Sequence, residues 1–220
     1  NKIQLLKNFC EKILGKGVLI CGDTPGFLGN RIGVYAMQVA MIEAVNMNLS
    51  IEEADAIFGR PMGIPKTGVF ALYDLIGIDL MSDVLKSFKK ELPKNDAFQK
   101  VADGIPIINE LIKTGYTGRK GKGGFYRINK NDGKKILEAL DLKKNQYFEA
   151  KKINLQINKM NLLELINRND IYGKYAWSVI SKIILYSSSL VPQITEEYND
   201  IDEALRLGFN WSMGPFEMLE

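Results

Sequence analysis

Histidine is absent from the 220 residues of this chain. Without an imidazole, Ser–His–Asp and Cys–His catalytic arrangements are excluded, as is any metal site that needs a histidine ligand. Cysteine is scarce as well, because Cys10 and Cys21 are the only two and they lack metal-ligand spacing. Two such cysteines are expected to be reduced and buried, which favours a cytoplasmic location.

Neither sign of charge predominates, and long uncharged apolar runs are missing. The 29 basic and 26 acidic residues give a net charge of +3, and the basic residues are scattered, so no nucleic acid partner is expected. Gln38 and Glu43 interrupt the apolar run over residues 33–45, and Lys182 interrupts the run over 175–191. Both runs fall short of the ~18 apolar residues of a membrane span, so we expect buried helices.

The two ends of the sequence do not resemble natural termini. The chain starts at Asn1 without an initiator methionine or a signal-like segment, and residues 214–220 stop in mid-pattern, so we expect a piece of a longer protein. Residues 3–14 have the apolar spacing of a helix, and the run over 18–21 predicts a buried strand. Together these two elements make half of a parallel α/β unit.

Capping residues predict where the next helices begin. Thr24 is a suitable N-cap and Pro25 suits the first helical position, so a long helix is expected from here to about Asn46. Residues 50–53 read Ser-Ile-Glu-Glu, a capping box that predicts a second, short helix ending near Gly59.

Periodicity, glycine and proline predict the remaining elements. Helices are expected over residues 70–88 with an irregularity at Gly77, over 96–113 with a break near Pro106, over 162–167, and from 173 to about 192. For residues 125–150 we favour a small β-hairpin that turns at 141–145, although 134–140 also has helical propensity.

The two halves of the sequence share a faint internal repeat. Each half has a long apolar helix, then a short helix with an aspartate, then a glycine-containing turn and a phenylalanine. The matching residues are Tyr35, Asp55 and Phe70 in the first half, and Tyr175, Asp202 and Phe216 in the second. Periodicity alone does not distinguish a true duplication from glycine, proline and capping positions that helical sequences commonly share.

Two runs of residues resemble a known family. Residues 23–31 read Asp-Thr-Pro-Gly-Phe-Leu-Gly-Asn-Arg, and residues 115–126 form a lysine- and glycine-rich run that ends in Gly-Gly-Phe-Tyr. Both resemble segments of the helical C-terminal domain of 3-hydroxyacyl-CoA dehydrogenases. The resemblance implies a mainly α fold, a duplicated helical bundle with a small β-hairpin and a remnant helix and strand of the NAD-binding domain. It divides the chain into residues 1–22 (that remnant), 23–126 (the first helical domain), 127–170 (hairpin and connector) and 171–220 (a second, truncated repeat).

The resemblance also implies a function. Enzymes of this family oxidise the 3-hydroxyl group of an acyl-CoA in fatty-acid β-oxidation and pass a hydride to NAD. In them, NAD and the catalytic histidine–glutamate pair belong to the N-terminal domain. This chain would then be the substrate-covering and assembly part, inactive by itself. Its implied partners are the acyl-CoA substrate, its own NAD-binding domain, and either a second subunit or its own second repeat.

Asn30 and Arg31 are the first candidate site residues. If Thr24 caps the helix, Asn30 lies near its second turn, where an amide can donate to a carbonyl or an enolate-like oxygen. The resemblance gives Asn30 a catalytic and substrate-binding role, whereas the alternative is an ordinary polar helix residue. Arg31 is expected to pair with a carboxylate across the domain junction or to be solvated.

The glycine-rich run supplies weaker candidates. Arg119, Lys120 and Lys122 could reach phosphates of CoA or of the dinucleotide, and Lys120 is taken as a weak substrate contact. A surface loop leading into a strand explains the run equally well. Neither GxxxxGK[ST] nor a GxGxxG after a strand occurs, so no phosphate cradle of either type is encoded.

Two other function classes stay open at this point. One is a helical dimerisation or assembly module without an active site. The other is the helical domain of a different NAD-dependent dehydrogenase, such as those that act on phosphogluconate or nucleotide-sugars. The pattern of binding to CoA esters and sugar phosphates distinguishes the three hypotheses.

Overall fold

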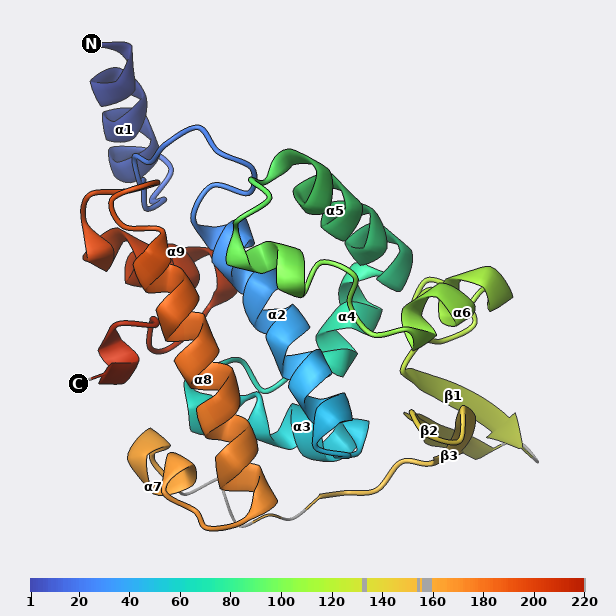
Figure 1. Cartoon of the computed structure of the whole chain (residues 1–220). Coiled ribbons are helices and arrows are strands. Elements are labelled where there is room, and N and C mark those ends of the chain that lie inside the picture. The colour runs from blue at the N-terminus through green and yellow to red at the C-terminus, as the bar shows by residue number, and fades with distance from the viewer. Residues whose placement is uncertain (132–133, 154, 156–159, 220) are drawn as a thin grey trace.

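A long apolar helix, α2 (Gly29–Asn46), runs through the centre of the molecule (Figure 1). The computed structural model describes residues 1–131, 134–153, 155 and 160–219. Every residue of α2 from Arg31 to Met41 is buried. A helix that is apolar on nearly all sides is stable only when neighbours surround it, and the other helices pack around α2 accordingly.

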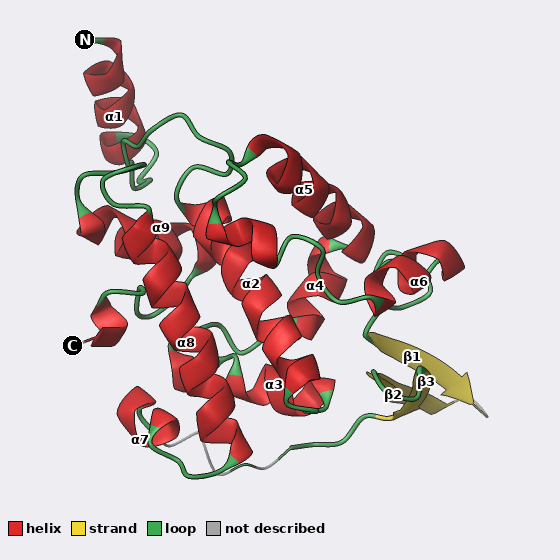
Figure 2. Cartoon of the chain, viewed as in Figure 1, coloured by secondary structure: helices red, strands yellow, loops and turns green. Residues whose placement is uncertain are grey.

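The fold is mainly helical, with one small sheet at its edge (Figure 2). The helices of the first half are α1 (Lys2–Lys12), α2, α3 (Ile51–Ile57), η1 (Arg60–Met62), α4 (Phe70–Ile76), α5 (Ile78–Glu91), η2 (Ala97–Lys100) and α6 (Ile107–Thr114). The strands are β1 (Tyr126–Asn131), β2 (Lys134–Asp141) and β3 (Gln146–Glu149). The later helices are α7 (Leu162–Ile166), α8 (Ile171–Ser189), α9 (Tyr198–Phe209) and η4 (Glu217–Leu219).

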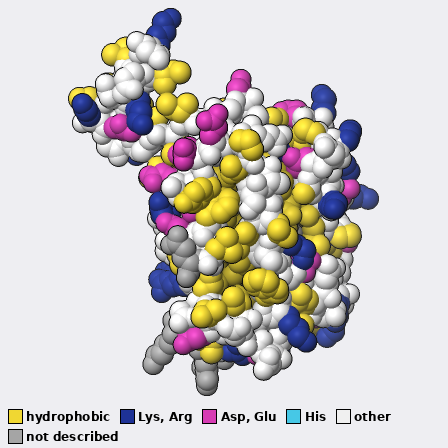
Figure 3. All heavy atoms as spheres, turned by 60° about the vertical axis from the view of Figure 1, so that its left-hand side comes forward, with side chains coloured by type: hydrophobic (Ala, Val, Ile, Leu, Met, Phe, Trp, Pro, Cys, Tyr) yellow, Lys and Arg dark blue, Asp and Glu magenta, His cyan; other side chains and the backbone are white. Residues whose placement is uncertain are grey.

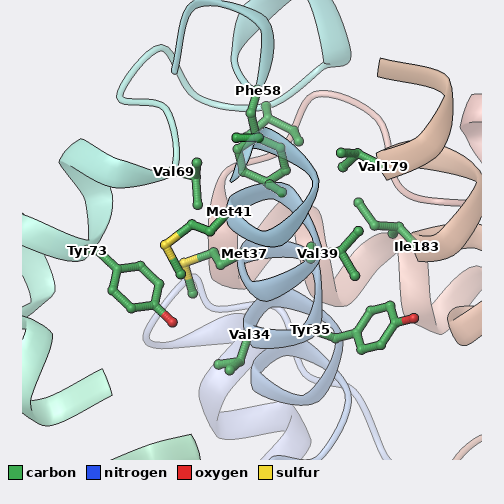
Figure 4. Close-up of a cluster of buried hydrophobic side chains, with 14 of the residues drawn as sticks. Val34, Tyr35, Met37, Val39, Met41, Phe58, Val69, Tyr73, Val179 and Ile183 are labelled. Carbon is green, nitrogen blue, oxygen red and sulfur yellow. The ribbon is translucent and has the colours of Figure 1, made fainter. Parts of the chain in front are cut away.

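The core lies on both sides of α2. Tyr35 and Val39 point toward α8, whereas Met37 and Met41 point toward Tyr73 of α4 (Figure 4). All five side chains are buried. Because α8 covers one side of α2 and α4 the other, a helix from each half of the chain is needed to exclude water from the centre.

Most of the predicted helix boundaries are confirmed. The capping box at Ser50 is present, with reciprocal hydrogen bonds between Ser50 and Glu53. Gly77 separates α4 from α5 with a φ of 113°, a conformation that favours glycine. The helix expected over residues 96–113 is instead η2 and α6, with Pro106 immediately before α6.

The start of α2 differs from the prediction. Thr24 does not cap it, because residues 25–28 form a turn in which the Phe27 amide donates to the Thr24 carbonyl at 2.9 Å. Gly26 and Phe27 have φ values of 80° and 49°. These left-handed conformations cannot continue a right-handed helix, so α2 begins only at Gly29.

Two strand predictions also change. The strand expected over residues 18–21 is absent, since the segment pairs with no strand among the described residues, and Ile20 is exposed. The hairpin is a three-stranded antiparallel sheet of order β1-β2-β3, with Ile128 opposite Leu137 and Ala139 opposite Phe148. Residues 134–140 are therefore strand and not helix, while the turn at 141–145 is confirmed.

Apolar side chains are exposed on α1 and on α8, among other places. α1 extends away from the other helices (Figure 1), has no buried residue and exposes Ile3, Leu6 and Phe9. Hydrophobic side chains also gather on the side of the molecule that Figure 3 turns forward. α8 contributes the exposed side chains of Trp177 and Leu185. No helix in the described part of the chain has the length and apolarity that crossing a bilayer requires.

Candidate functional site

Asn30 is the second residue of α2, in its first turn and not in the predicted second turn. Its side chain is exposed. Unpaired backbone N–H groups at a helix start carry partial positive charge, so an oxygen near this turn is favoured. The Asn30 side chain is therefore open to solvent in the first turn of α2, while the next two amides are already bonded, Arg31 N–H to the Gly26 carbonyl and Ile32 N–H to the Leu28 carbonyl, both at 3.1 Å.

Arg31 lies in the interior, where its side chain is only 2% exposed. Its guanidinium forms an ion pair with Asp96, whose side chain is 6% exposed. Nε donates to the Tyr186 hydroxyl at 2.6 Å, and that hydroxyl donates to Asp96 Oδ1 at 3.1 Å. Nη1 reaches the Pro25 carbonyl at 3.4 Å. This network joins the turn before α2, the start of η2 and the end of α8.

Arg31 is not solvated, and it does pair with a carboxylate as predicted, but this carboxylate, Asp96, lies within residues 23–126 and not across the predicted domain junction. Its partner Asp96 also caps η2, accepting from the Phe98 amide at 2.7 Å. The sequence predicts a helix start at Asp96, but no local pattern links Asp96 to Tyr186 or Arg31. Burial raises the pKa of Tyr186, which keeps its hydroxyl protonated.

The glycine-rich loop is folded against α4 and α5. Lys120 pairs with Asp79 at 2.9 Å in a half-exposed contact, and the Lys122 ammonium donates to the Thr114 carbonyl at 3.1 Å. Gly118 and Gly123 form a backbone bridge, and the Arg119 amide donates to the Asp74 carbonyl at 2.8 Å.

Asn30 and Lys120 lie at opposite ends of α5. Asp79, the partner of Lys120, is in the first turn of α5, whereas Phe88 near its end lies against Gly26, just before α2. The 14 residues of α5 extend over about 20 Å at ~1.5 Å per residue. One ligand would have to stretch along this helix to touch both residues.

A groove of about 1150 Å³ lies beside the glycine-rich loop. Basic side chains outnumber acidic ones along it, and they come from the connection between η1 and α4, the glycine-rich loop, the sheet and the segment that follows β3. They are Lys66, Arg119, Lys122, Arg127, Lys130, Lys151 and Lys152. Arg119 and Lys122 thus face this groove, whereas Lys120 does not line it.

Two buried aspartates also line this groove. Asp55 accepts from the Phe70 amide at 2.7 Å, the Ala71 amide at 3.1 Å and the Tyr126 hydroxyl at 3.0 Å. Burial raises its pKa to about 7, against the lowering effect of these donors. Asp74 accepts from the Phe125 amide at 2.8 Å and the Tyr126 amide at 2.7 Å, and burial raises its pKa to about 6. Both carboxyl groups therefore hold the start of β1 against α3 and α4.

The second half of the chain repeats the arrangement around Asp55. Asp202 accepts from the Phe216 amide at 2.9 Å and the Glu217 amide at 3.2 Å, just as Asp55 accepts at the start of α4. A Cβ placed on Gly68 would lie 2.4 Å from Asp55 Cβ, and one placed on Gly214 would lie 2.4 Å from Asp202 Cβ. In both halves an aspartate caps a later helix, and a glycine allows that helix to approach.

Comparisons with known proteins agree on one family. The family model of the 3-hydroxyacyl-CoA dehydrogenase C-terminal domain matches residues 26–128. A Rickettsia prowazekii protein named as a fatty acid oxidation complex trifunctional enzyme is 39% identical over 217 residues, which are 99% of this chain and 30% of that protein. A Bacillus subtilis protein named as a 3-hydroxyacyl-CoA dehydrogenase is 33% identical over 98% of this chain and 28% of its own length.

A mitochondrial relative matches a shorter part. Mouse hydroxyacyl-coenzyme A dehydrogenase is 35% identical over 128 residues, which are 56% of this chain and 38% of that protein. The chain thus spans about 30% of the length of the Rickettsia and Bacillus relatives.

Proposed function

Because the chain belongs to the 3-hydroxyacyl-CoA dehydrogenase family through its C-terminal helical domain, we propose that it covers the substrate and mediates assembly in such an enzyme. The reaction of the whole protein is oxidation of an acyl-CoA 3-hydroxyl group in cytoplasmic fatty-acid β-oxidation, with NAD as acceptor. The observation that carries this proposal is the exposed amide of Asn30 beside the fixed side chain of Arg31.

In this proposal Asn30 is a catalytic residue that donates to the substrate oxygen which gains negative charge as the ketone forms. Its neighbour Arg31 fixes the first turn of α2 through buried contacts to Asp96 and Tyr186. A donor that is held in place before the reaction stabilises developing charge without a reorganisation cost. Lys120 is a weaker, second contact for a CoA phosphate at the far end of α5.

The described residues do not fit NAD. A dinucleotide pyrophosphate binds where a glycine-rich turn joins a parallel strand to a helix N-terminus. In the described part of this chain the sheet is antiparallel, and the glycine-rich loop leads into β1 and not into a helix. NAD and the proton-abstracting histidine therefore belong to the nucleotide-binding domain of the assembled enzyme, and we expect the 220 residues alone to show no turnover.

Assembly would use the exposed apolar surfaces. The apolar side of α1, with Ile3, Leu6 and Phe9, is suited to packing against the nucleotide-binding domain. The pairing of α2 with α8 and the matching Asp55 and Asp202 caps support a division into a first helical domain (23–126), a connector (127–170) and a second repeat (171–220). The second repeat then covers α2 in the way a partner subunit would cover it.

Calorimetric titration of the chain with 3-hydroxybutyryl-CoA tests the proposal. We expect saturable binding that Asn30→Ala weakens about fivefold, the usual worth of one hydrogen bond. Asn46→Ala, at the exposed far end of α2, is the matched control and should bind like the parent chain. A lack of binding to any CoA ester would instead favour an assembly module without an active site, and binding of sugar phosphates alone would favour another dehydrogenase class.

A further inference from the structure

The groove beside the glycine-rich loop carries exposed basic side chains without acidic partners. Five of its cations form no ion pair with a carboxylate in the described part of the chain: Lys66, Arg119, Lys130, Lys151 and Lys152. The three carboxylates of the groove are already engaged by backbone N–H groups. Glu52 accepts from the Lys151 amide at 3.1 Å, Asp55 from amides at the start of α4, and Asp74 from amides at the start of β1. Such a surplus of exposed cations attracts an anionic ligand.

β1 leaves one edge of the sheet without a partner strand. The strand order is β1-β2-β3, so β1 pairs only with β2. Leu137 of β2 lies opposite Ile128, and its carbonyl accepts from the Ala150 amide on the other side at 2.8 Å. By the alternation of an antiparallel ladder, Ile128 and Lys130 therefore direct their N–H and C=O groups away from β2. No described group bonds to these backbone groups, so the edge is open to a further strand.

This open edge borders the groove. At its start, the Tyr126 amide donates to Asp74 at 2.7 Å and the Tyr126 carbonyl accepts from the Gly124 amide at 2.8 Å. Asp74, Tyr126 and Ile128 all line the groove. Ile128 and Leu137, directly opposite each other, are 62% and 52% exposed. Apolar surface, open backbone groups and cations thus meet in one place.

We propose that this groove docks an extended acidic segment of another polypeptide, which adds as a strand to the outer edge of β1. Main-chain hydrogen bonds to Ile128 and Lys130 fix its register, and its apolar side chains cover Ile128 and Leu137. Its carboxylates meet the surrounding cations. At about 1150 Å³ the groove also exceeds the ~300–1000 Å³ of sites for small molecules, as a stretch of polypeptide requires.

Two simpler explanations of the cations account for only part of the groove. Lysines on an edge strand hinder aggregation, which explains Lys130 but not Lys66, Arg119 and Lys152, because those three come from outside the sheet. Lys130 also lies opposite Lys135, and a like-charge pair of this kind disfavours the sheet until an anion compensates it. A phosphate ligand would use the cations but neither the open backbone edge nor the exposed apolar pair.

Fluorescence anisotropy with a labelled acetyl-Glu-Val-Glu-Val-Glu-Val-Glu-amide peptide tests the proposal. We expect saturable binding that weakens as the salt concentration rises. The block peptide Glu-Glu-Glu-Glu-Val-Val-Val has the same charge and composition but loses the alternation of a strand, so it should bind about tenfold more weakly. An added strand uses the amides of alternate residues, so N-methylation of either all valines or all glutamates should abolish binding, but not both.

Variants of the chain give the second readout. Lys66→Glu/Lys151→Glu should weaken peptide binding about tenfold, whereas the control Lys94→Glu/Lys100→Glu, at exposed positions outside the groove, should not. Ile128→Pro removes an outward N–H without removing a bond to β2, so it should bind about fivefold more weakly than Ile128→Ala. Circular dichroism and thermal unfolding check that each variant is folded, and the charge variants keep the test valid if Ile128→Pro does not fold.

Four results would overturn the proposal. One is a lack of saturable binding, or equal binding of the alternating, block and both N-methylated peptides. Another is displacement of the peptide by inorganic tripolyphosphate where sodium chloride of the same ionic strength does not displace it, because the groove is then a phosphate site. Displacement by 3-hydroxybutyryl-CoA would assign the groove to the substrate. Self-association of the chain that Lys66→Glu/Lys151→Glu abolishes in ultracentrifugation would make a second copy the occupant.

Discussion

Removal of the Arg31 guanidinium, as in Arg31→Met, should destabilise the whole chain. The pair between Arg31 and Asp96 is buried, with side-chain exposures of 2% and 6%, and Tyr186 and the Phe98 amide complete the hydrogen bonds of the carboxylate. A methionine keeps the apolar contacts of the arginine stem but leaves the Asp96 charge without a cation. Breaking one side of a buried pair costs about 3–5 kcal/mol.

This loss is large against total stability. A domain of this kind is stable by about 5–15 kcal/mol, so the variant should lose about a fifth or more of its free energy of unfolding. At ~2–4 °C per kcal/mol for a chain of this length, the Tm should fall by about 10 °C. Because Arg31 also reaches the Pro25 carbonyl, the turn before Asn30 should loosen, and binding of 3-hydroxybutyryl-CoA should weaken as well.

Urea unfolding followed by circular dichroism measures the effect. Lys86→Met is the control, because Lys86 and Asp83 form a pair whose side chains are 70% and 73% exposed, and its loss should be undetectable. The double variant Arg31→Met/Asp96→Leu should recover part of the loss, since no buried charge is then left unpaired. A single variant within about 1 kcal/mol of the parent, or a double variant that is additive, would refute the reasoning.

Three further predictions concern stability. Burial raises the pKa of Asp55 in the folded state from its ordinary 3.8 to about 7, so its contribution to stability is full below about pH 4 and is lost as pH rises through about 7. The free energy of unfolding of the parent, minus that of Asp55→Asn at each pH, should show this fall, and an opposite slope would contradict it. Gly68→Ala should cost about 2–4 kcal/mol in urea unfolding, because φ is 77° and the added Cβ would lie 2.4 Å from Asp55 Cβ; a neutral change would exclude the close approach. Trp177→Ser should leave the urea midpoint unchanged but lower self-association in ultracentrifugation, since this side chain is 55% exposed on α8; a lowered midpoint would mean that it is packed.

Local signals predicted the helices well because their causes lie within a few residues. The capping box at Ser50 and the break at Gly77 depend only on neighbouring groups, and both are confirmed. The start of α2 failed because Thr24 has suitable chemistry, but the left-handed turn at Gly26 and Phe27 intervenes. The strand at residues 18–21 failed because a strand needs a pairing partner, which no local pattern can provide.

The same distinction between local and distant causes applies to the residues of the candidate site. The Asn30 motif was visible because it is contiguous, and its exposure at the start of α2 agrees with a role in binding. The burial of Arg31 could not be predicted, because its partners Asp96 and Tyr186 are 65 and 155 positions away. Phe209, whose ring lies against Gly33, is similarly distant from α2 in sequence. Contacts of this kind depend on how the two halves of the chain pack together, and local sequence patterns do not predict that packing.

The way in which the halves pack has one consequence for the site. Asp55 caps α4 and Asp202 caps η4 with the same pair of backbone contacts, and α2 and α8 lie together between them. Yet the two halves are unequal, since the Asn30 motif, residues 23–31, occurs only in the first. The second half instead supplies Tyr186 to the network that fixes Arg31, and Phe209 to the side of α2 at Gly29 and Gly33. The second half therefore both covers the apolar surface of α2 and holds a buried side chain at the start of that helix, because packed helices that share a face exclude water from it together.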